Sequence, residues 1–285
     1  MPDETPRIGP KAAEDEIPLR PRGRSRGLAM RGVVPNAITA AAMCAGLTGI
    51  RFAIGGMWKE AVLAVVLAGV LDGIDGRMAR LLKAQSRFGA ELDSLADSLS
   101  FGTAPALILF LWSLGDLTRL GWFAALAFAI AGALRLARFN AQIDVKEQPH
   151  KSAGFLTGIP APVGAGLAFL PVYLWLATGE PLFRDPRLVA PWTAFVGFLM
   201  ISNLATLSWG RMRPRSDVRL AVIAIVGLVF AALLLEPWWT LSAICLGYLA
   251  TMPWSIARYA RIKRQRAAAA RPVPEPFDAA TRDLH

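Results

Sequence analysis

The chain has 285 residues, of which 54% are hydrophobic and 18% charged, and its formal net charge is +10. Its apolar residues fall in blocks of about 20, the length that a helix needs to cross a hydrocarbon core. The composition therefore excludes an ordinary soluble domain and indicates an all-α polytopic membrane protein. The basic residues gather at the ends of the apolar blocks and in the tails, so membrane topology explains them and no nucleic-acid partner is expected.

About eight apolar segments follow one another along the chain, and each is predicted to be a transmembrane helix. Glycine and proline residues, such as Gly55 and Pro237, separate them. Polar tails flank the segments: residues 1–27 are predicted to be a disordered cytoplasmic tail, and residues 261–285 a second one. The segments cover approximately residues 33–54, 59–82, 90–113, 119–141, 155–178, 189–209, 218–236 and 238–259.

Lysine and arginine are distributed unevenly between the two sets of connections. The two tails and the connections near residues 83–89, 142–154 and 211–219 hold most of them. The opposite set holds only Lys59, Arg119, Arg184 and Arg187. Because basic residues are retained on the cytoplasmic side, this asymmetry predicts that both termini lie in the cytoplasm.

Four aspartates interrupt the apolar pattern near the predicted cytoplasmic face. Asp72 and Asp75 share one face of the second segment, and Asp93 and Asp97 are spaced i, i+4 on the third. Two antiparallel helices joined by a short loop could bring all four carboxylates to one point. Ionisable residues at membrane depth are costly and usually mark a functional site.

Converging carboxylates repel one another unless a cation neutralises them. Ligands that are all oxygen favour Mg²⁺ or Mn²⁺, and two such ions could clamp a phosphoryl group between attacking and leaving oxygens. Arg80 suits a phosphate, and Gly76 would let a substrate approach the backbone. Metal-assisted phosphoryl transfer is the leading interpretation. Interfacial ion pairs with arginine, or a cation- or proton-coupled transporter, are the alternatives.

The pattern Asp72-x-x-Asp75-Gly76-x-x-Ala79-Arg80, followed after eight residues by Gly89-x-x-x-Asp93-x-x-x-Asp97, resembles the complete motif of the CDP-alcohol phosphotransferases. The resemblance implies a six-helix core, assigned to residues 28–215, with two additional transmembrane helices in residues 216–260. It also implies two Mg²⁺ or Mn²⁺ ions, an active site open to the cytoplasm and a homodimer.

The same resemblance implies roles for individual residues. Asp72, Asp75 and Asp93 match the metal ligands, and Asp97 matches a metal-adjacent general base. The positions that match contacts to the CDP-lipid are Gly76, Arg80 and Ser86, together with Asn36 and Thr39 in a P-N-x-x-T sequence at the start of the first helix. A plain helix start is the alternative interpretation of that last sequence.

The acceptor alcohol is indicated by sequence beyond the motif. The stretches "DSLADSLSFGTAPA" and "ALRLARFN" are similar to the integral-membrane phosphatidylserine synthases of this family. That similarity implies CDP-diacylglycerol and L-serine as substrates and membrane lipids as partners. Arg138, with Arg135, is predicted to hold the serine carboxylate, and Asn140 is predicted to be a further serine-binding residue, although the arginines could also be positive-inside anchors. Glycerol 3-phosphate, inositol phosphate and choline are the alternative acceptors.

Overall fold

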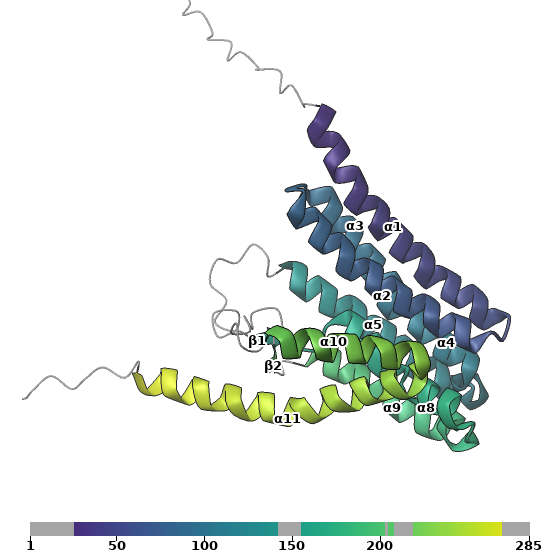
Figure 1. The fold of residues 1–285 in the computed structure, drawn as a ribbon. Helices are drawn as coiled ribbons and strands as arrows, with labels where there is room; N and C mark the ends of the chain where they lie inside the picture. The colour runs from purple at the N-terminus through teal and green to yellow at the C-terminus, as the bar shows by residue number, and fades with distance from the viewer. Residues whose placement is uncertain (1–25, 142–154, 203–204, 208–218, 270–285) are drawn as a thin grey trace, which may run out of the picture.

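The fold is almost entirely helical, as a computed structural model of the chain shows (Figure 1). The structure describes residues 26–141, 155–202, 205–207 and 219–269. Most of the two predicted tails, and the basic connections within 142–154 and 208–218, lie outside the described residues. The first helix already begins at Arg26, inside the range assigned to the N-terminal tail.

The first two helices form an antiparallel hairpin that carries one wall of the site described below. α1 spans Arg26–Ile54 and α2 spans Trp58–Leu81, and the two lie side by side (Figure 1). Gly56 in the connecting turn has φ +72°, a conformation that glycine adopts without strain. Small residues allow the helices to approach closely, because a Cβ on Gly49 would lie 2.9 Å from the carbonyl oxygen of Ala61.

The third segment is one continuous helical path with a π-helix in its middle. α3 (Arg87–Asp97) leads into η1 (Ser98–Thr103) and then α4 (Ala104–Trp112). Ser86 caps the N-terminus of α3, since its Oγ accepts a hydrogen bond from the backbone N–H of Gly89 at 3.0 Å. Within η1, the Ser100 hydroxyl donates to the Ala42 carbonyl of α1 at 3.3 Å. The π-helix therefore packs directly against the hairpin.

The remaining elements surround this framework. α5 packs against α9 and η1, while α11 packs against α8 and α10. Large buried side chains fill the space between them, including Trp112, Phe128 and Tyr173. The elements are η2 (Leu114–Leu117), α5 (Arg119–Ala141), α7 (Ala161–Ala168), α8 (Leu170–Thr178), η3 (Pro181–Arg184), α9 (Pro186–Ile201), α10 (Arg219–Leu235) and α11 (Pro237–Ala269).

Two predicted helices are shorter than expected, and a small antiparallel ladder replaces their ends. β1 (Phe155–Thr157) pairs with β2 (Ala205–Leu207), although residues 155–178 and 189–209 were both predicted to be helical. Gly158, at φ +75°, and Pro160 delay the start of α7 to Ala161, because proline lacks the N–H needed inside a helix. The helix predicted to reach residue 209 ends at Ile201.

The last helix is longer than expected. α11 continues to Ala269, past residue 260, where the disordered C-terminal tail was predicted to begin. Residues 261–269 consist of lysine, arginine, glutamine, isoleucine and alanine, most of which have high helix propensity. The polar composition that indicated a tail is therefore compatible with a continued helix.

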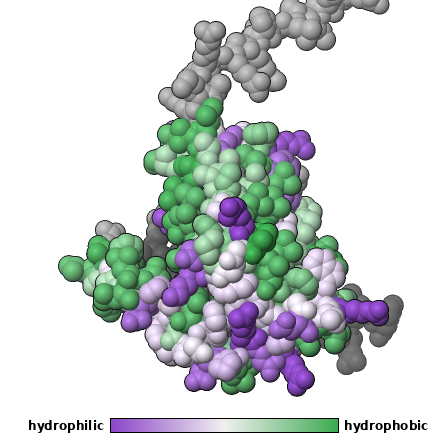
Figure 2. Space-filling model, turned by 90° about the vertical axis from the view of Figure 1, so that its right-hand side faces the viewer, coloured by the Kyte–Doolittle hydropathy of each residue, from purple (hydrophilic) through white to green (hydrophobic). Residues whose placement is uncertain are grey.

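The surface confirms an all-α polytopic integral membrane protein. Among the described residues, the helical stretches long and apolar enough to cross a membrane are Gly32–Ile54, Arg87–Trp112, Arg119–Ala141 and Ala161–Thr178, with shorter apolar helices at Pro186–Ile201 and Leu220–Leu235. Large apolar side chains are exposed, such as Leu228 of α10 at 71%. Hydrophobic residues cover much of the face in Figure 2. So much exposed apolar surface requires a lipid environment. The count of about eight spans stays a prediction.

Candidate active site

The four aspartates predicted to converge do lie together, at one end of α2 and α3. One carboxylate oxygen from each of Asp72, Asp75 and Asp93 lies within 4.8 Å of the others. Asp97, one turn after Asp93, is in hydrogen-bonding contact with Asp72. The i, i+3 spacing on α2 and the i, i+4 spacing on α3 place the members of each pair on one helical face. We call these four residues the acidic cluster.

The acidic cluster gathers four carboxylates, which repel one another when ionised. Asp75 is only 3% exposed, and burial strengthens the repulsion between neighbouring carboxylates. Arg135 of α5 interacts electrostatically with Asp97 of the cluster. Carboxylate oxygens are the ligands that hard divalent cations prefer. The residues present therefore fit a divalent metal site.

Thr39 of α1 orients one of the carboxylates. Its hydroxyl lies 2.6 Å from Oδ2 of Asp75, to which it donates a hydrogen bond, and 3.1 Å from the carbonyl oxygen of Pro35. Both Thr39 and Asp75 are buried. Outer partners of this kind hold metal-binding carboxylates in place. The α1–α2 hairpin thus has a direct part in building the cluster.

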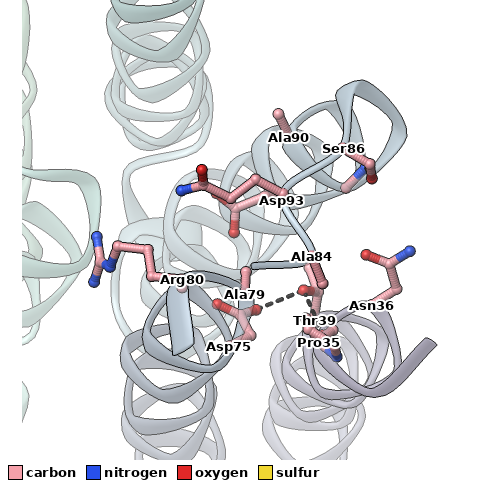
Figure 3. A pocket seen from close by; sticks show the side chains of 13 residues that line it. Pro35, Asn36, Thr39, Asp75, Ala79, Arg80, Ala84, Ser86, Ala90 and Asp93 are labelled. Carbon is pink, nitrogen blue, oxygen red and sulfur yellow. Dashed lines mark hydrogen bonds between the residues drawn. The ribbon is translucent and has the colours of Figure 1, made fainter. Parts of the chain in front are cut away.

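A cavity of about 290 Å³ opens beside Asp75 and Asp93 (Figure 3). Asn36 and Ser86 lie on one side of the two aspartates, and the Arg80 side chain extends on the other. A Cβ on Gly89 would lie 3.0 Å from Oδ1 of Asn36, so glycine permits this close approach. The cavity is lined by Pro35, Asn36, Thr39, Asp75, Gly76, Ala79, Arg80, Ala84, Gln85, Ser86, Gly89, Ala90 and Asp93.

Every residue predicted to contact the CDP-lipid lines this cavity, namely Asn36, Thr39, Gly76, Arg80 and Ser86. A Cβ on Gly76 would meet no atom within 4 Å, so its backbone is open to a ligand. Two of these side chains also have structural partners: Thr39 bonds Asp75, and Ser86 caps α3. Their contribution to ligand binding stays a prediction.

The residues predicted to bind serine lie at the C-terminal end of α5. Arg135 interacts electrostatically with Asp97, and its buried Nε has no hydrogen-bond partner among the described residues. Arg138 is half-buried one turn further on. Asn140 donates from Nδ2 to the Ser94 hydroxyl at 2.9 Å, immediately beside Asp93 in the chain. Asn140 therefore links α5 to the helix that carries the acidic cluster.

Sequence reasoning did not single out Ser94, Gln85 or Tyr248. Gln85 lines the cavity within the eight-residue interval of the motif, where position alone could have suggested it. Tyr248 of α11 lies within electrostatic range of Arg135. No local signal connects Tyr248 with Arg135, because the two residues lie on helices far apart in the sequence.

Comparison with known families gives this geometry a context. The family model described as CDP-alcohol phosphatidyltransferase matches residues 32–209, more than half of the chain. The chain belongs to the CDP-alcohol phosphatidyltransferase family. A second model, described as CDP-alcohol phosphatidyltransferase 2, matches residues 217–253, most of which lie in α10 and α11. The resemblance noted from the aspartate motif is thereby confirmed.

Similar members of the CDP-alcohol phosphatidyltransferase family share the name CDP-diacylglycerol–serine O-phosphatidyltransferase. The protein of Mycobacterium tuberculosis (strain ATCC 25618 / H37Rv) is 35% identical over 237 residues, 83% of this chain and 82% of the relative. That of Mycobacterium leprae (strain TN) is 36% identical over 82% of this chain and 78% of the relative. That of Helicobacter pylori (strain ATCC 700392 / 26695) is 34% identical over 69% and 81%, respectively.

Family membership decides between the two classes left open by the sequence. A CDP-alcohol phosphatidyltransferase is an enzyme of phospholipid biosynthesis and not a transporter. The family depends on divalent metal in general, which agrees with the oxygen-rich acidic cluster. The site in this chain is thus a candidate active site for phosphotransfer at a membrane.

Proposed function

We propose that this chain transfers the phosphatidyl group of CDP-diacylglycerol to the hydroxyl of L-serine, forming phosphatidylserine and CMP. The observation that carries the proposal is the convergence of Asp72, Asp75, Asp93 and Asp97 beside an open cavity. The serine-specific name shared by relatives that match most of the chain supports this acceptor.

The acidic cluster would hold two Mg²⁺ or Mn²⁺ ions, with Asp72, Asp75 and Asp93 as ligands and Asp97 beside them. When bound, the ions would neutralise the pyrophosphate of the donor and stabilise the attacking and leaving oxygens. Thr39 keeps the Asp75 carboxylate in one orientation for this task.

Asp97 is proposed to act as the general base. Its carboxylate takes the proton of the serine hydroxyl, whose oxygen forms a bond to the phosphorus that bears diacylglycerol. The bond from that phosphorus to the bridging oxygen breaks, and this oxygen leaves with CMP. A positioned base of this kind contributes a factor of about 10² to 10⁴ in rate.

The substrates would be held by the residues around the cluster. Asn36, Gly76, Arg80 and Ser86 line the cavity proposed to accept the CDP part of the donor, with Thr39 at its base. At the end of α5, Arg138 and Arg135 would bind the serine carboxylate, because guanidinium groups pair with carboxylates. Asn140 would contribute by holding α5 against α3 through Ser94.

The activity is tested by CMP release. Purified protein with CDP-diacylglycerol and Mn²⁺ or Mg²⁺ should release CMP when L-serine is present, and the lipid product should be phosphatidylserine. Parallel reactions with glycerol 3-phosphate, inositol phosphate and choline provide the comparison. Turnover with one of these but not with serine would contradict the acceptor and keep the phosphotransfer chemistry.

The role of Asp97 is tested by Asp97→Asn. Because amide nitrogen and oxygen cannot take the proton, turnover should fall at least about 10²-fold, while metal-dependent CDP binding measured by calorimetry is retained. Asp116→Asn, at an exposed aspartate of η2, is the matched control and should leave turnover unchanged. An active Asp97→Asn enzyme would rule out this base.

We also propose that the protein lies in the inner membrane, with the acidic cluster and both termini in the cytoplasm. Residues 28–215 would form the catalytic core, and residues 216–260 would add two further helices. The chain is proposed to form a homodimer. The asymmetric distribution of lysine and arginine supports the orientation. A fluorescent reporter that folds only in the cytoplasm, fused to the C-terminus, should be bright. Cross-linking in native membranes should yield a species of twice the chain mass.

A further inference from the structure

A second cavity, of about 340 Å³, lies among α2, η1, α7, α8 and α11. Its lining is almost wholly apolar, and α11 forms one wall with Leu241, Ile244, Cys245 and Tyr248. We call it the α11 cavity. α11 lies beyond residues 32–209, the part of the chain that matches the principal family model. The wall is therefore supplied by a helix outside that match.

The α11 cavity and the acidic cluster share two helical paths. Gly69 lines the cavity and precedes Asp72 by three residues on α2, so both share one helical face. Phe101, another lining residue, follows Asp97 by four residues along the same helical path. On α2 and on the α3–η1–α4 path, residues of the acidic cluster therefore lie about one turn from residues of the apolar cavity wall.

A third connection runs through α5. Tyr248 lines the cavity and lies within electrostatic range of Arg135, which interacts with Asp97. Tyr248 is half-buried, and its hydroxyl is the polar end of an otherwise apolar α11 wall. The cavity therefore has a polar end near the cluster and an apolar body away from it, which matches a lipid in which a charged head joins a hydrocarbon chain.

We propose that the α11 cavity binds one acyl chain of the lipid donor and makes turnover dependent on the length of that chain. The inference rests on the proposed function, because it requires the donor phosphates to lie at the acidic cluster. Hydrocarbon is the occupant that fits, since the lining offers extensive apolar surface and few polar groups. A chain held between α2, α7 and α11 is shielded from the bulk lipid on those sides.

The cavity can be filled with one substitution. Gly166 lines it, and a Cβ at this position would meet no atom within 4 Å. Gly166→Leu should therefore occupy the space without displacing the backbone. Gly247→Leu is the matched control, because a Cβ there also meets nothing within 4 Å and Gly247 does not line the cavity. Both substitutions put the same side chain into a helix.

The readout compares dipalmitoyl with dihexanoyl CDP-diacylglycerol, with serine as acceptor, in mixed micelles. Gly166→Leu should lower kcat/KM for the long-chain donor by at least about tenfold, the loss expected when about two methylene groups no longer reach apolar surroundings. The same variant should leave kcat/KM for the short-chain donor nearly unchanged, and Gly247→Leu should alter neither. Equal losses with both donors would overturn the inference.

A measurement on the unchanged protein covers the case in which Gly166→Leu does not fold. CDP-diacylglycerol with a diazirine on one acyl chain is photolysed with the protein and metal in the absence of serine. Adducts on peptides containing Gly69, Phe101 or Tyr248 support the inference, and adducts confined to exposed residues of α10 overturn it. Failure of the proposed function is distinct, because the unchanged protein would then release no CMP from either donor.

Discussion

At the scale of single residues, Thr39 shows how one hydroxyl can control a carboxylate. We predict that Thr39→Val weakens divalent metal binding by about tenfold or more, since loss of an outer hydrogen bond of this kind typically costs that much. The substitution removes the donor to Asp75 and leaves a buried carboxylate oxygen without its partner. Calorimetric titration with Mn²⁺ measures the effect. Thr39→Ser keeps the hydroxyl and should bind the metal nearly normally; equal weakening in both variants would contradict this role.

A second prediction concerns the close packing of Gly89 against its neighbours. A Cβ there would lie 3.0 Å from Oδ1 of Asn36 and 3.2 Å from Oγ of Ser86. We expect Gly89→Ala to push Asn36 out of place and to raise KM for CDP-diacylglycerol more than it lowers kcat. Gly73→Ala, whose Cβ would meet no atom within 4 Å, is the control. If steady-state kinetics show no change in KM, Asn36 does not contact the donor.

Some residue-level features were predictable and others were not. The spacing of Asp72, Asp75, Asp93 and Asp97 indicated convergence because helical periodicity alone places each pair on one face. The partner of Asn140 was not predictable, because it depends on how α5 crosses α3. The interaction of Arg135 with Asp97 was hidden for the same reason, because it depends on how α5 packs against the third segment.

At the scale of elements, the bond between Ser94 and Asn140 joins α3 to α5 beside Asp93. We predict that Ser94→Ala and Asn140→Ala each destabilise the protein and that their effects are not additive. The coupling energy should be about 0.5–1.5 kcal/mol, the net value of one hydrogen bond. Unfolding in detergent of both single variants and the double variant completes the cycle. Strict additivity would show that the bond contributes nothing to holding the two helices together.

The positions of the helices followed from hydropathy, except where pairing with a distant part of the chain determines the local structure. The first four apolar segments coincide closely with α1, α2, the α3–η1–α4 path and α5. The β1–β2 ladder was missed because each strand has only three residues and pairs with a partner far along the chain. Apolar residues in so short a strand look like a continuing helix, and periodicity cannot separate the two.

At the scale of the whole molecule, we expect the acidic cluster to couple metal binding to folding. We predict that a chelator abolishes turnover and that Mn²⁺ or Mg²⁺ restores it. An ion that binds only the folded state at about 100 times its Kd adds about 2.7 kcal/mol to the free energy of unfolding. Thermal unfolding with and without metal measures this gain. Asp93→Asn should show a smaller gain, and an unchanged one would exclude Asp93 as a ligand.

The π-helix between α3 and α4 has a consequence for how the chain tolerates change in length. A π turn contains one residue more than an α-helical turn, so η1 adjusts the rotational phase between Asp97 and the buried face of α4. Removing one residue from Ser98–Thr103 would let this turn close as an α-helical turn, with the helix beyond it in nearly the same rotational phase, whereas removing one residue from α4 would rotate the residues beyond the deletion by about 100°. A deletion of one residue within η1 should therefore be better tolerated than one within α4.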